Sequence, residues 1–99
     1  MAGLPGGFGP EEPADAHVQA ASDKVKAQFV KESGINAGKF KALSYISQVV
    51  AGTIYIVKVF VGDQCCHVKI FVPLPYTGKQ PELMGFQSGK TKEESITVF

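Results

Sequence analysis

The spacing of apolar residues in the first third of the chain predicts one helix. Four of them recur at intervals of three and four, and they are Val18, Ala21, Val25 and Phe29. This spacing puts them on one side of an α-helix, as core residues. Pro13 suits the first turn, Asp15 complements the positive end of the helix, and Gly34 suits the stop. We expect a helix of about 18 to 20 residues, whose apolar stripe must cover a sheet.

Beyond residue 40 the apolar residues alternate, as they do in strands. Residues 40–47 form one expected strand and residues 53–61 the next. A third runs from residue 65 to Pro73, which cannot donate a hydrogen bond to its neighbour. Residues 95–99 alternate into an expected final strand. The pattern predicts an α+β fold with a four- to five-stranded antiparallel sheet wrapped around one long α-helix.

Both faces of the strand at residues 53–61 are apolar. One face carries Tyr55, Val57, Val59 and Val61, and we expect it to pack against the helix. The other carries Ile54, Ile56, Lys58 and Phe60, which is unusually apolar for a face in contact with water. Such a face favours association with another molecule.

Residues 48–52 connect the first two long strands and predict a hairpin with an apolar tip. Val49 and Val50 favour extended backbone, while Ala51 and Gly52 remove bulk and let the chain reverse. An apolar tip is expected to be buried in a partner, because turns in water are usually polar. Periodicity alone leaves a second possibility open, in which both valines belong to the core and the turn lies elsewhere.

Composition narrows the range of functions. The 99 residues predict a single domain, 1–99, with a formal net charge of +1. All ten basic residues are lysines spread along the chain, so we expect no nucleic-acid partner. No apolar run is long enough for a membrane span, and the first residues do not resemble a secretory signal, so we expect no membrane partner.

Cys65, Cys66 and His67 are adjacent, which invites a catalytic or metal-binding interpretation. Neighbouring residues in a strand point to opposite faces, so a disulfide between the cysteines would be strained and a shared metal ion is disfavoured. One strand also cannot supply a base and an oxyanion site. We expect no catalytic residue, no metal and no cofactor, hence no enzyme, and a reducing cytoplasmic location.

Two further segments are rich in glycine and proline. Residues 1–12 form a flexible N-terminal trunk, and residues 74–78 form a loop in which Tyr76 offers ring area and a hydroxyl group. From the residues alone, a frayed terminus is the favoured interpretation of the first segment and an ordinary turn that of the second.

The sequence of residues 48–52, QVVAG, resembles the hairpin of the cystatin superfamily. It occurs together with Pro5-Gly6-Gly7 near the start, a helix before it, Leu74-Pro75 after it and an aromatic C-terminus. In this order and spacing the chain resembles the stefins, or type 1 cystatins, along nearly all its length. One departure is Val98-Phe99, where stefins commonly carry an aromatic pair.

The resemblance implies the cystatin fold and reversible, tight-binding, competitive inhibition of papain-like cysteine proteases such as cathepsins. It also implies a three-part wedge that plugs the active-site cleft. The protease-binding residues would be Leu4, Pro5, Gly6 and Gly7 in the trunk, Gln48, Val49, Val50, Ala51 and Gly52 in the hairpin, and Leu74, Pro75 and Tyr76 in the second loop. Counting back from the hairpin without gaps makes Gly6 the essential trunk glycine, and Gly7 and Gly3 are further candidates.

Two expectations concern assembly. The alternative to an inhibitor is a non-inhibitory cystatin-fold module for interaction or self-assembly, suggested by the apolar face around Ile56. For the inhibitor we expect an active monomer. Opening the hairpin at residues 48–52 would let two copies exchange their halves as a domain-swapped dimer without inhibitory activity.

Overall fold

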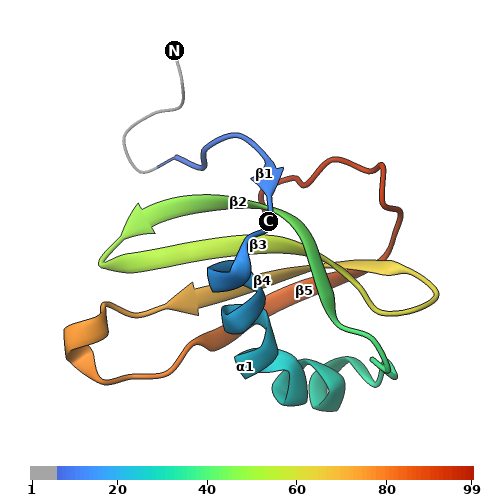
Figure 1. The fold of residues 1–99 in the computed structure, drawn as a ribbon, viewed down its shortest axis with the longest axis horizontal. Coiled ribbons are helices and arrows are strands. Elements are labelled where there is room, and N and C mark those ends of the chain that lie inside the picture. The colour runs from blue at the N-terminus through green and yellow to red at the C-terminus, as the bar shows by residue number, and fades with distance from the viewer. Residues whose placement is uncertain (1–6) are drawn as a thin grey trace.

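The computed structural model describes residues 7–99, which form one long helix packed across an antiparallel sheet (Figure 1). The strands follow one another in the sheet in the same order as in the chain. This architecture confirms the predicted α+β fold with five strands. The elements are β1 (Glu12–Pro13), α1 (Ala16–Ser33), β2 (Lys41–Val50), β3 (Gly52–Phe60), β4 (Cys65–Val72), the 3₁₀ helix η1 (Pro75–Thr77) and β5 (Glu82–Lys90).

Both ends of α1 are capped. At its start the Asp15 carboxylate accepts a hydrogen bond from the backbone N–H of Val18 at 2.9 Å. At its end Gly34 adopts φ 71°, and its N–H donates to the carbonyl of Val30 at 3.0 Å. The predicted length and C-terminal stop are therefore confirmed. Within residues 7–99, no helix combines the length and the apolar character needed to cross a membrane.

The prediction that Pro13 begins the helix is wrong. Pro13 lies in β1, opposite Ser44 of β2, and the next residue, Ala14, donates its N–H to the carbonyl of Leu43 at 3.0 Å. The helix begins only after Asp15 has supplied the N-cap. A proline tolerates this position because an edge strand can do without its N–H.

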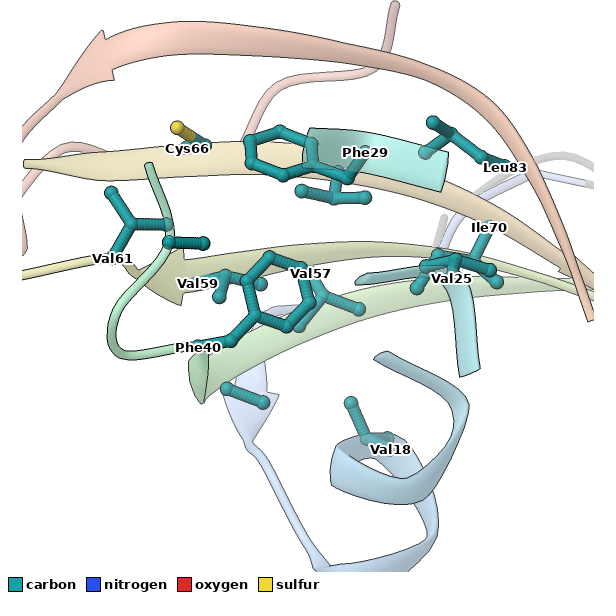
Figure 2. Packing of buried hydrophobic residues seen from close by; sticks show 13 residues of the cluster. Val18, Val25, Phe29, Phe40, Val57, Val59, Val61, Cys66, Ile70 and Leu83 are labelled. Atoms are coloured by element: carbon teal, nitrogen blue, oxygen red, sulfur yellow. The ribbon is translucent and has the colours of Figure 1, made fainter. Parts of the chain in front are cut away.

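The core lies between α1 and the inner face of the sheet, as the alternation predicted. Phe29 is fully buried and contacts the rings of Phe40 and Phe86, with ring centres 5.4 and 5.3 Å away. Figure 2 shows Phe29 among apolar side chains that come from β3, β4, β5 and α1. The remaining buried members of this cluster include Val18, Val25, Val57, Val59, Val61, Cys66, Val68 and Ile70.

The opposite, outer face of the sheet is covered by both ends of the chain. Ile46, Ile56 and Ile96 form a second buried cluster, against which Phe8 and Phe99 pack. Ile56 is 0% exposed. The expectation of an open apolar face is therefore wrong at its centre. The trunk takes part in this cover, because Phe8 packs against the cluster.

The expected strand at residues 95–99 is also wrong. The fifth strand is β5, and residues 91–99, here called the C-terminal segment, return along the sheet without joining it (Figure 1). The alternation arises because Ile96 is buried in the outer cluster and Phe99 packs beside it. The carbonyl of Phe99 also accepts a hydrogen bond from the Lys69 ammonium group.

Candidate functional site

The chain reversal in the hairpin tip, residues 48–52, takes fewer residues than expected. β2 and β3 stay paired up to Val50 and Gly52, so Ala51 alone forms the reversal. The side chain of Val49 is 78% exposed and that of Val50 is 40% exposed. The possibility that both valines belong to the core is therefore wrong. The tip presents apolar side chains to the surroundings at the end of a β2–β3 pairing that continues up to Val50 and Gly52.

Gly52 is required by the packing of the hairpin itself. Its φ is +124°, and a Cβ atom there would lie 2.6 Å from the carbonyl oxygen of Val72 and 3.0 Å from the ring of Phe71. Gly52 is buried, whereas Ala51 is exposed. The sequence suggested that Gly52 removes bulk and lets the chain reverse. The structure adds a packing reason, because β4 passes directly against the glycine backbone.

The second loop, residues 74–76, lies at the same end of the sheet as the hairpin tip (Figure 1). The pairing of Thr53 with Val72 brings the two together. Tyr76 is 84% exposed, and Leu74 is half-buried. Thr77 holds the loop in shape by donating its N–H and its hydroxyl to the carbonyl of Leu74, at 3.0 and 2.8 Å.

Of the four predicted trunk residues, Leu4, Pro5 and Gly6 lie outside the described residues, and Gly7 is exposed. Two positions farther along, Gly9 donates its N–H to the carbonyl of Ser47 at 2.9 Å. This bond joins the trunk to β2 one residue before the hairpin tip.

Sequence reasoning missed the residues that anchor the trunk. Phe8 packs on the outer face, and Glu11 accepts hydrogen bonds from Ser44 and Ile96. The available signal was an isolated aromatic residue, Phe8, in a segment otherwise rich in glycine and proline. Its partner, the cluster around Ile96, lies at the other end of the chain and could not be paired with it from the sequence.

The tip and the second loop form an uncharged apolar surface. Residues 48–52 and 74–78 contain no charged side chain. Excluding water from such a surface is favourable, and the Tyr76 hydroxyl can add a directional hydrogen bond. The arrangement suits binding to a concave apolar site.

The cysteines do not form a reactive site. Cys65 and Cys66 are free thiols that are 1% and 0% exposed. Burial raises the pKa of both thiols, that of Cys66 to about 11. Among the residues that the structure describes, no group of three His, Cys, Asp or Glu side chains could hold a metal ion.

His67 makes stability depend on pH. It is 0% exposed, and neither ring nitrogen has a hydrogen-bond partner among the described residues. Burial lowers the pKa of His67 from its usual 6.5, and the charges of Lys90 and Lys58 act in the same direction. The unfolded chain then binds this proton more readily. The contribution of neutral His67 to stability is therefore fully present above pH 6.5, and it is lost as the pH falls towards the lowered pKa of His67.

We expect the free energy of unfolding, measured by urea titration, to rise between about pH 5 and pH 7. The substitution His67→Leu should flatten this rise. It should also add about 1 to 2 kcal/mol at the acidic end, since it deletes two unpaired buried nitrogens. Equal pH slopes in the variant and the parent would contradict this assignment.

The chain matches known proteins over nearly all its length. Residues 6–93 match the cystatin domain family. Cystatin-A of Mus musculus is 43% identical over 98 residues, covering 97% of this chain and 99% of the relative. A Sus scrofa protein named leukocyte cysteine proteinase inhibitor 1 is 39% identical over 97% of this chain and 94% of its own length. Cystatin-B of Homo sapiens is 39% identical over 89% of this chain and 91% of its own length. With this coverage and the observed fold, the chain belongs to the cystatin family, as a member of the stefin type.

Proposed function

We propose that this protein is a reversible, tight-binding, competitive inhibitor of papain-like cysteine proteases, with cathepsins among its targets. It is a binding protein and not an enzyme, in keeping with the family and with the name of the Sus scrofa relative. The observation that carries the proposal is the exposed, uncharged hairpin tip. Val49 is 78% exposed there, and Tyr76, 84% exposed, lies on the loop at the same end of the sheet.

The proposed inhibitory surface is a wedge made of residues 4–7, 48–52 and 74–76. The tip would enter the active-site cleft beside the catalytic cysteine, where Val49 and Val50 lose contact with water. Because the ladder holds the hairpin up to its last pair, little conformational entropy is lost on binding. The chain would pass the cleft without presenting a peptide carbonyl for attack. We expect an interface of about 1,600 Å², the usual size for protease–inhibitor complexes.

An inhibition assay with papain tests the proposal directly. Progress curves at increasing substrate concentration should show inhibition that substrate relieves, with one inhibitor bound per enzyme. Recovery of full enzyme activity on dilution would establish reversibility. Absence of inhibition at micromolar concentration of a folded chain would refute the proposal.

The trunk offers a second test. Removing residues 1–7 leaves Phe8, which packs on the outer face, so the fold should be retained. The shortened chain should dissociate from papain about tenfold faster, because lost contacts appear mainly in the dissociation rate. The loss should be largest with proteases whose clefts are partly occluded. An unchanged rate with several proteases would remove the trunk from the wedge.

Removing residues 1–10 serves as the comparison. It also deletes Phe8 and the bond from Gly9 to Ser47, so it should lower stability as well as affinity. Thermal unfolding of both chains separates the two effects.

The monomer is the proposed inhibitory form. Exchange of hairpin halves between two copies would turn residues 48–52 into continuous strand and remove the tip, so a swapped dimer should not inhibit. Size-exclusion chromatography after mild heating, with an assay of each peak, tests this. The alternative of a self-assembly module is weakened because Ile56, at the centre of its supposed surface, is covered by the chain's own ends.

A cytoplasmic location is also proposed. It is supported by Cys65 and Cys66, which are free thiols and suit a reducing compartment.

A further inference from the structure

The Glu11 carboxylate lies where three segments of the chain meet. One oxygen, Oε2, accepts a hydrogen bond from the Ser44 hydroxyl at 2.6 Å and lies 3.4 Å from the Lys58 ammonium group. The other oxygen, Oε1, accepts from the backbone N–H of Ile96 at 3.2 Å. Glu11 thus connects the trunk to β2, to β3 and to the C-terminal segment.

Lys58 strengthens this connection because its charge is almost removed from water. Its side chain is only 5% exposed, against 32% for that of Glu11. The ammonium group donates to the carbonyl of Lys92 at 2.6 Å, and the Glu11 carboxylate supplies the opposite charge. A buried charge needs such a partner, since an uncompensated one is strongly destabilising.

The direction of the trunk along β2 determines what the contacts of Glu11 achieve. Glu12 pairs with Tyr45, and Gly9 bonds to Ser47, so the trunk runs antiparallel to β2. Following the trunk towards the N-terminus therefore leads towards the hairpin tip. Glu11 lies between these two attachment points. It therefore helps to hold residues 9–12 along β2, whose next residues form the hairpin tip.

We propose that Glu11 is a positioning residue for the inhibitory surface, which fixes residues 9–12 of the trunk along β2 before a protease binds. This rests on the proposed function and adds a residue that touches no protease. A trunk already held in place loses less conformational freedom on binding, so the complex is tighter. Hydrogen bonds to an ionised acceptor suit the task because they are stronger than neutral ones.

The test compares Glu11→Ala and Glu11→Gln with the parent chain, each with and without residues 1–7. In the full chain, Glu11→Ala should speed dissociation from papain about tenfold. In the shortened chain the same substitution should have no effect, because no trunk remains to be positioned. Glu11→Gln keeps the shape but not the charge and should give a smaller increase.

Glu12→Ala is the matched control. Glu12 is the adjacent acid and lies in β1, and its substitution should leave the dissociation rate unchanged. An equal increase in the full and the shortened Glu11 variants would indicate a general loss of structure and overturn the proposal. An unchanged rate in the full chain would also overturn it.

Amide exchange of Gly9 provides a readout that does not depend on inhibition. Its N–H donates to Ser47, so its exchange should be accelerated in Glu11→Ala by a larger factor than that of core amides in β4, which report any loss of global stability. If the parent failed to inhibit papain, the proposed function would fall, and this exchange would still test whether Glu11 holds the trunk on β2. Unchanged exchange at Gly9 would overturn the positioning role of Glu11 alone.

Discussion

Val50→Asp should weaken inhibition of papain by about 3 kcal/mol, roughly a hundredfold, while leaving the protein folded. Val50 is the last residue of β2 and is 40% exposed, so a carboxylate there stays in water in the free inhibitor. In the complex the same carboxylate would be buried without a partner, which is costly. Dissociation constants from progress curves, together with urea unfolding of each variant, measure the two effects separately.

Ala27→Asp is the control for this substitution. Ala27 is exposed on α1, so its substitution by Asp adds the same charge away from the hairpin. It should change neither inhibition nor stability by more than about 0.5 kcal/mol. If Val50→Asp inhibited papain as well as the parent, the hairpin tip would not be the inhibitory surface.

Gly52→Ala should lower the free energy of unfolding by about 3 kcal/mol and weaken inhibition as well. The new methyl group would overlap the carbonyl of Val72, and the backbone at φ +124° is unfavourable for any other residue. β2, β3 and β4 must then move apart at the end of the sheet that carries the tip and the second loop. Urea unfolding gives the stability change, and papain inhibition under native conditions gives the functional one.

Gly38→Ala is the matched comparison because a Cβ atom at Gly38 meets nothing within 4 Å. It should be neutral or stabilise by up to about 1 kcal/mol, through the reduced freedom of the unfolded chain. A Gly52→Ala variant as stable as Gly38→Ala would show that the hairpin can relax, and the internal role assigned to Gly52 would be wrong.

The elements that local chemistry determines were predictable. The stripe ending at Phe29 and the stop at Gly34 gave the helix, and the alternation around Val57 gave the inner face of the sheet. For residues 48–52 the pattern left two possibilities open, and the resemblance of QVVAG to the cystatin hairpin favoured the one that the structure confirms.

What was missed depends on contacts between distant parts of the chain. β5 contains two glycines, Gly85 and Gly89, which weaken a strand pattern, and pairing with β4 overrides this local preference. The outer face looked open because Ile96 and Phe8, which cover it, are far from Ile56 in the sequence. No periodicity along one strand can reveal a cover supplied by both ends of the chain.

Contacts between distant residues also limit how much of the candidate site could be predicted from the sequence. The exposed valines and Tyr76 could be proposed from local composition. The place of Gly52 against Val72 and the attachment of Glu11 to Ile96 require the fold.

The burial of the two cysteines has a chemical consequence for an inhibitor of thiol enzymes. With a pKa of about 11, the Cys66 thiol is ionised in roughly one molecule in ten thousand at neutral pH, and both sulfur atoms are out of reach of solvent. A mixed disulfide with a protease's active-site sulfur would need an oxidant as well as a thiolate and access to it, so these buried cysteines are not suited to form one. Inhibitor and enzyme would then dissociate without any covalent change to their sulfur atoms.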